Sequence, residues 1–123
     1  WELYTHVITD DEKVDLKKLP SAKGIWAPCL TYCEADNLFY VVYGVMNSMN
    51  ARYFDVDNYL ITAKDLRGPW SEPVYLHSSG FDASMFHDDD GKKWLLNLDN
   101  HYAEGKRFNG QEQNTRNRVQ SVL

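Results

Sequence analysis

The chain has 123 residues, enough for one modest domain and too few for two. Apolar residues make up 43% and aromatic residues 14%, so a packed core is expected and wholesale disorder is not. The 13 basic and 18 acidic residues give a net charge of -5, which argues against nucleic acid or an anionic membrane as a partner. No apolar run reaches the roughly 18 residues of a membrane span, and no signal peptide opens the chain.

Short β-strands separated by turns are predicted along most of the chain. Aromatic and β-branched residues, which fit a pleated and buried surface, mark the strands. In chain order we expect strands at 27–32, 38–45, 58–63 and 94–98, with turns at 34–37, 65–69 and 88–91. No stretch carries apolar residues at helical spacing for three turns. The expected fold is therefore all-β: a sandwich, a barrel or a propeller.

Cys29 and Cys33 fall in the first of these strands or just beyond it. Residues four apart on a straight strand share a face but lie about 13 Å apart, whereas a disulfide requires Cα atoms closer than about 7 Å. We therefore expect two free thiols, which favours a reducing compartment and hence a cytoplasmic location. The histidines are scattered and show no zinc-ligand spacing, so neither a metal nor another cofactor is expected.

A weak internal repeat favours a propeller. Residues 27–40 and 82–95, which are 55 positions apart, each contain a small-residue start, a short apolar strand, an acidic turn and an aromatic-led strand. Repeats of roughly 40 to 55 residues built from short strands are typical of propeller blades, although two unrelated hairpins with acidic turns would also look alike. The repeat predicts equivalent positions for Ala27 and Asp82, where the innermost strand of each blade begins and faces the central axis.

The length of the chain fits about two to three blades at about 45 residues each, whereas propellers close with four to eight blades. The first residue is Trp1 and not Met, so we expect the chain to begin partway through a longer protein. Residues 111–123 show no strand alternation and few core residues. We expect a partial propeller domain over residues 1–110 and an atypical, disordered or non-native tail over residues 111–123.

Three short motifs occur in the order Gly24-Ile-Trp-Ala-Pro28, Gly68-Pro-Trp-Ser-Glu-Pro73 and Gly80-Phe-Asp-Ala-Ser84. Together they resemble glycoside hydrolase family 43, and within it the β-xylosidases that act on short xylo-oligosaccharides. The resemblance covers residues 1–110 of the chain. It implies a five-bladed β-propeller with the sugar site at one end of its axis. It also implies hydrolysis with inversion at the anomeric carbon.

Inversion requires two carboxyl groups about 6.5 to 9.5 Å apart, one to deprotonate water and one to protonate the leaving oxygen. The resemblance implies a third carboxylate, which keeps the acid protonated and helps to orient it, and Asp82 matches its position. It places the base Asp upstream of Trp1 and the acid Glu downstream of Asp82, in a context that Glu104 does not match. We therefore expect a glycosidase as the parent protein and no activity from this piece alone.

The resemblance also assigns Trp26 to the wall of the sugar subsite, where an indole can pack on the C–H face of a pyranose ring. Ordinary core packing is the alternative for this residue. The run Asp88–Asp90 suggests calcium, but its spacing does not match an EF-hand loop, and the Asp-Gly step that follows favours a hairpin turn. Asn100 stands where xylosidases of this family often have a Trp, which leaves an α-L-arabinofuranosidase open.

Two interpretations from other functional classes remain. A non-catalytic propeller fragment or carbohydrate-binding module would lack the upstream Asp and the downstream Glu. A generic all-β interaction repeat would place Ala27 and Asp82 on different faces. The expected partner is an oligosaccharide substrate, and the sequence leaves the sugar, the linkage and the oligomeric state open, including a homo-oligomer.

Overall fold

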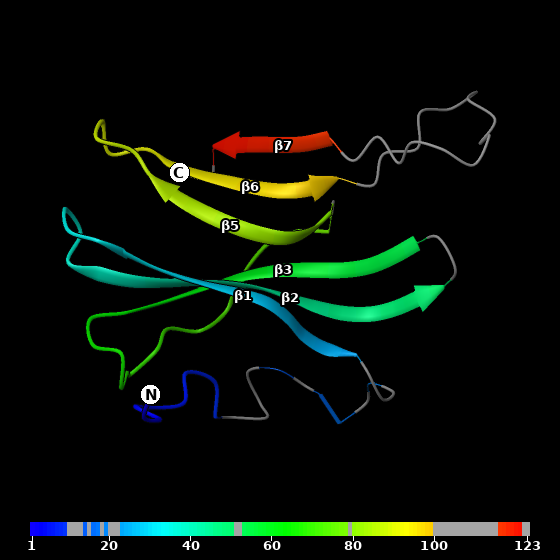
Figure 1. Ribbon diagram of the computed structural model, residues 1–123, viewed down its shortest axis with the longest axis horizontal. Coiled ribbons are helices and arrows are strands. Elements are labelled where there is room, and N and C mark those ends of the chain that lie inside the picture. The colour runs from blue at the N-terminus through cyan, green and yellow to red at the C-terminus, as the bar shows by residue number, and fades with distance from the viewer. Residues whose placement is uncertain are drawn as a thin grey trace.

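The computed structural model describes residues 1–9, 14, 16, 17, 19, 23–50, 53–78, 80–99 and 116–121. Within these residues, seven β-strands form two sheets (Figure 1). Neighbouring strands are antiparallel throughout. The four-stranded sheet has the order β1 (Gly24–Cys33), β2 (Leu38–Asn50), β3 (Tyr53–Ala63) and β4 (Val74–His77). The three-stranded sheet has the order β5 (Phe81–His87), β6 (Lys93–Asp99) and β7 (Arg116–Ser121).

The all-β fold expected from the sequence is confirmed. A four-stranded antiparallel meander is the blade of a propeller, so the first sheet forms one whole blade and the second sheet supplies three strands of the next. The described strands amount to slightly less than two blades, just below the two to three expected from the length. The residues that the structure describes include no helix that could cross a membrane.

The C-terminal part of the chain differs from its expected lack of structure. Arg116–Ser121 forms β7, which pairs with β6 from Trp94 opposite Ser121 to Asp99 opposite Arg116. Strand pairing uses backbone N–H and C=O groups, so the free edge of β6 can pair with a segment that shows no apolar alternation. The boundary expected at residue 110 lies outside the described residues.

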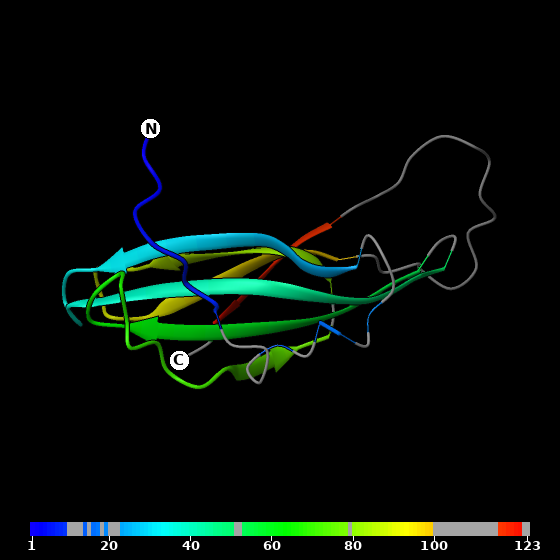
Figure 2. The same ribbon diagram turned by 90° about the horizontal axis from the view of Figure 1, so that it is seen from below.

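Apolar side chains cover both faces of the first sheet. A different part of the chain lies on each side of this sheet. In Figure 1 the N-terminal segment lies below the first sheet and the second sheet lies above it. Figure 2 shows the N-terminal segment crossing β1 and β2. The face toward the second sheet is packed in a buried cluster of Cys33, Tyr40, Val42, Leu60, Ala83, Met85 and Leu95. The face toward the N-terminal segment is packed in a second cluster built on Val14, Val41, Tyr43 and Ile61.

A polar cluster of five side chains also joins the two sheets: Thr31, Asp36, Tyr40, His87 and Lys93. Lys93 Nζ at the start of β6 lies 2.6 Å from Asp36 Oδ2 in the β1–β2 turn, and the Tyr40 hydroxyl donates to the same oxygen at 2.5 Å. Thr31 Oγ1 and His87 Nε2 are 2.8 Å apart, and the rings of Tyr40 and His87 lie 4.8 Å apart between centroids. These contacts hold β5 and β6 against β1 and β2.

The charge on Asp36 is strongly favoured in this cluster. Hydrogen bonds from Lys93 and from Tyr40 lower the pKa of Asp36 from 3.8 to about 2. Burial raises the pKa of the Tyr40 hydroxyl and lowers the pKa of His87, so both stay neutral near pH 7. Folding depresses the pKa of Asp36, so this carboxylate stabilises the folded state at pH values above its ordinary pKa of 3.8. That stabilisation is lost as the pH falls toward 2.

We predict that Asp36→Asn in the protein that carries this chain lowers the thermal unfolding midpoint at pH 7, because it leaves the nearly buried Lys93 ammonium without its carboxylate. The variant should also lose less stability than the original protein between about pH 4 and pH 2, where Asp36 takes up its proton. Differential scanning calorimetry across this pH range measures both effects.

Asp90→Asn is the matched control. Asp90 pairs with Lys92 within one hairpin, and both side chains are about half exposed, so this ion pair should contribute little to stability. Equal effects of the two substitutions would show that the cluster does not hold the sheets together.

Candidate active site

The innermost strands of the two sheets contain the same irregularity. In β1 the register with β2 shifts between Trp26 and Cys29, so that residues 27 and 28 stand opposite the single position 43. In β5 the register with β6 shifts between Phe81 and Ser84, so that residues 82 and 83 stand opposite position 97. Each shift is a β-bulge, a feature that bends a strand and re-aims a side chain.

The first residue of each bulge has a left-handed backbone. The φ angle is 42° at Ala27 and 54° at Asp82. The two residues lie 55 positions apart, β1 and β5 pack against each other, and both strands begin on the same side of the molecule (right in Figure 1). The equivalence of Ala27 and Asp82 that the repeat predicts is therefore confirmed in backbone conformation and in position.

A left-handed backbone is disfavoured for residues other than glycine, although Asp tolerates it better than Ala does. Conformations of this kind cost of order 1–3 kcal/mol each and cluster at functional sites. At Asp82 the conformation turns the carboxylate out of the regular alternation of β5. Ala27 has the same left-handed backbone as Asp82 but carries no carboxylate.

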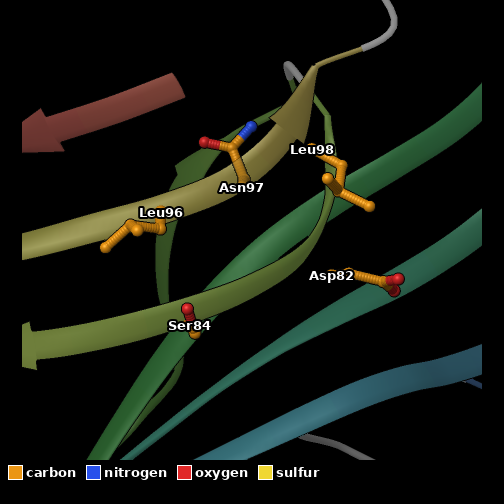
Figure 3. Close-up of a pocket in the computed structure, with 5 residues that line it drawn as sticks. All are labelled: Asp82, Ser84, Leu96, Asn97 and Leu98. Atoms are coloured by element: carbon orange, nitrogen blue, oxygen red, sulfur yellow. The ribbon is translucent and has the colours of Figure 1, made fainter. Parts of the chain in front are cut away.

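Asp82 lies at the rim of a pocket of about 180 Å³ between the first two strands of the second sheet (Figure 3). Asp82 and Ser84 come from β5, and Leu96, Asn97 and Leu98 come from β6. Asp82 is exposed. The pocket therefore offers one carboxylate, one hydroxyl and one amide beside two leucines.

Trp26 lies on the face of the first sheet that is turned toward the second sheet. It stands opposite Gly44 of β2, which stands opposite Asn58 of β3, and directly opposed residues of antiparallel strands share a face. Asn58 donates a hydrogen bond to Gly80 O at the entrance to β5, which identifies this face. The half-buried Trp26 thus directly precedes the bulge of β1, and the exposed Asp82 is the first residue of the equivalent bulge of β5.

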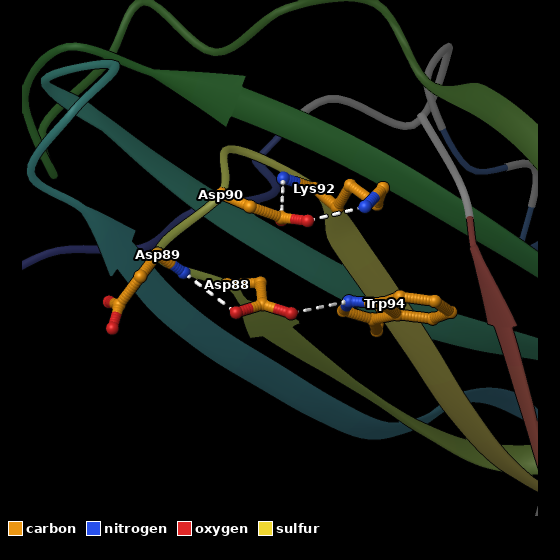
Figure 4. Close-up of polar contacts among 5 residues, drawn as sticks. All are labelled: Asp88, Asp89, Asp90, Lys92 and Trp94. Atoms are coloured by element: carbon orange, nitrogen blue, oxygen red, sulfur yellow. Dashed lines mark hydrogen bonds and ion pairs between the residues drawn. The ribbon is translucent and has the colours of Figure 1, made fainter.

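The run of aspartates forms a hairpin turn, as the Asp-Gly step predicts (Figure 4). Asp88 accepts hydrogen bonds from its neighbour's backbone at 2.8 Å and from the Trp94 indole N–H at 3.1 Å, and Asp90 bonds both the backbone and the ammonium of Lys92. The carboxylates of Asp88 and Asp90 are thus engaged within the hairpin. Among the described residues, no group of three or more His, Cys, Asp or Glu side chains is placed to hold a metal ion.

Cys29 and Cys33 are free thiols, as the strand spacing predicts. Cys29 is half-buried and Cys33 is buried. Glu104 and Asn100 lie outside the described residues, so the structure does not place them. The sequence interpretation gave no role to Asn58, which contacts the entrance to β5, and it included Gly80 and Ser84 only as the ends of the third motif. The available signal for Asn58 was a polar residue at the start of the largely apolar run 58–63.

We predict that Ala27→Val destabilises the protein by about 1–3 kcal/mol relative to Ala27→Asn, because a β-branched residue is strained at this φ angle and Asn is not. The Ala27 side chain is exposed, so the added atoms of either residue meet little steric obstruction and the comparison reports on the backbone. Thermal unfolding of the two variants measures the difference. Equal stability would contradict the assignment of a left-handed backbone at this bulge.

The chain matches the model of glycosyl hydrolases family 43 over residues 1–121. It is 45% identical over 98 residues to a β-xylosidase of Bacillus subtilis (strain 168) and 42% identical over 98 residues to xylosidase/arabinosidase 43B of Humicola insolens; each match covers 80% of this chain and 18% of the relative. The crystal structure of xylan β-1,4-xylosidase from Bacillus halodurans C-125 superposes with a TM-score of 0.74 at 44% identity, over 82% of this chain and 19% of that one.

The chain thus spans about a fifth of the length of the relatives it matches. The agreement extends from sequence to fold, since the solved structures of this family are five-bladed β-propellers and the described strands form adjoining blades. The chain belongs to glycoside hydrolase family 43.

Proposed function

We propose that this chain is part of an inverting glycoside hydrolase that removes xylose units from xylo-oligosaccharides. The observation that carries the proposal is the bulge at Asp82, which places an exposed carboxylate at the start of an innermost strand and at the rim of a pocket. Membership of family 43 and the names of the β-xylosidase relatives support the substrate class. The oligosaccharide is the partner that this function requires.

In this proposal Asp82 is the third carboxylate, beside a general acid supplied by another part of the protein. A negative charge near a carboxylic acid makes ionisation of that acid more costly and raises its pKa. The acid then retains at neutral pH the proton that the leaving oxygen needs. The left-handed bulge fixes the direction of the Asp82 side chain, which also allows it to orient the acid.

Trp26 forms part of the sugar subsite in the same proposal. Its position on the face toward β5, beside the equivalent bulge, would present the indole ring to a pyranose bound at the axis. One relative is named a xylosidase/arabinosidase and a more distant one an α-L-arabinofuranosidase, 35% identical over 104 residues. An arabinofuranosidase activity is therefore a second candidate within the same site, and it makes the same demands on Asp82.

We predict that Asp82→Asn in the complete enzyme lowers kcat by about 100-fold or more, the scale of general acid catalysis. The alkaline limb of the kcat profile should also move to lower pH, because the acid loses its proton more readily once the neighbouring negative charge is gone. Steady-state kinetics on a xylo-oligosaccharide between pH 4 and 9 measure both effects.

Asp89→Asn is the matched control, since Asp89 is an exposed carboxylate on the hairpin at the other end of β5. It should leave kcat and the pH profile unchanged. An Asp82→Asn enzyme with the original rate at every pH would refute the role assigned to Asp82.

A further inference from the structure

The connection from β4 to β5, which leads from the first sheet to the second, is held by the buried side chain of Asn58. Asn58 of β3 is fully buried, and its Nδ2 donates to His77 O at 3.3 Å and to Gly80 O at 3.0 Å. His77 ends β4 and Gly80 immediately precedes β5, so these two carbonyls flank the connection from the first sheet to the second. A side chain of the first sheet thus sets the backbone position two residues before Asp82.

The connection has little room to move on its other side. A Cβ atom on Gly80 would lie 2.2 Å from Asn97 Nδ2 and 2.2 Å from Leu98 O, so the backbone of this residue is pressed against β6. Its φ angle of +99° also favours glycine. Asn58 on one side and β6 on the other therefore define the path by which the chain enters β5.

The two ends of the Asn58 amide have different surroundings. Its oxygen lies near Gly44, which stands opposite Asn58 in β2: a Cβ atom on Gly44 would lie 3.6 Å from Asn58 Oδ1, an ordinary contact, and 2.8 Å from Val56 Cγ1, which is the closer obstacle. Asn58 Oδ1 is buried and has no hydrogen-bond partner among the described residues. The amide thus makes its hydrogen bonds through Nδ2 alone, to the two carbonyls that flank the connection.

We infer that Asn58 is a positioning residue for Asp82. The inference rests on the function proposed above for that carboxylate. From Gly80 the chain passes through Phe81 to the left-handed Asp82, and the direction of the carboxylate follows from the backbone at the bulge. Loss of the two hydrogen bonds would release the connection, let the bulge relax and displace the carboxylate from the acid. Displacements of about 1 Å at a catalytic group can reduce a rate by about 100-fold.

The test compares Asn58→Ala with Leu60→Ala in the complete enzyme. Leu60 is buried on the same strand and the same face and packs in the core between the sheets, so it controls for loss of packing. For each variant, kcat per folded molecule, KM and the pH profile of kcat are measured. Asn58→Ala should lower kcat about tenfold or more, change KM little and move the alkaline limb to lower pH. Leu60→Ala should reduce thermal stability while keeping kcat and the pH profile.

A double variant separates action through Asp82 from a general structural effect. If Asn58 acts through Asp82, Asn58→Ala combined with Asp82→Asn should be no slower than Asp82→Asn alone, because the positioned group is already gone. Multiplicative losses, or an unchanged alkaline limb in Asn58→Ala, would overturn the inference and leave the proposed role of Asp82 intact. A normal Asp82→Asn enzyme would instead refute the proposed function itself.

Gly80→Ala provides a second variant in case Asn58→Ala does not fold. It displaces the same connection from the opposite side by its clash with Leu98 O while leaving Asn58 in place. It should reproduce the shift of the alkaline limb. If neither variant folds and Leu60→Ala does, Asn58 serves stability only and the inference is wrong.

Discussion

A left-handed backbone at the start of an innermost strand is the constraint on which the site depends. In a regular strand, side chains alternate between the two faces of the sheet, and both faces of a propeller blade are packed against neighbours. The bulges at Ala27 and Asp82 interrupt that alternation at equivalent places in successive blades. Each bulge begins with an exposed residue, Ala27 in the first sheet and Asp82 in the second. At Asp82 the exposed side chain is a carboxylate, which is the group that the proposed function uses.

The rest of the fold holds these bulges in place. The apolar cluster between the sheets and the polar cluster around Asp36 and Lys93 fix β5 and β6 against β1 and β2. Asn58 fixes the connection that leads into β5. Packing therefore sets the relation between the sheets, and hydrogen bonds set the backbone just before Asp82. This division explains how a strained conformation can persist at an exposed position.

The strands at 38–45, 58–63 and 94–98 were predictable because burial on a pleated surface selects aromatic and β-branched residues. The equivalence of Ala27 and Asp82 was predictable from the repeat alone. The bulge itself was not, since Ala gives no signal for a left-handed backbone. Strand β7 was missed because backbone groups at the edge of β6 pair with it, and residues 116–121 show no apolar alternation in the sequence. Asn58 was missed because its partners are backbone carbonyls distant in sequence, which no local pattern reveals.

The proposed function requires that the two bulges converge on a sugar-binding axis. A crystal structure of the complete enzyme with a bound xylo-oligosaccharide, obtained with the catalytic acid disabled, tests it most directly. We expect a sugar ring beside the starts of β1 and β5, with the Trp26 indole against its C–H face and the Asp82 carboxylate directed at the acid. A ligand bound elsewhere, or an Asp82 side chain turned away from the ring and the acid, would contradict it.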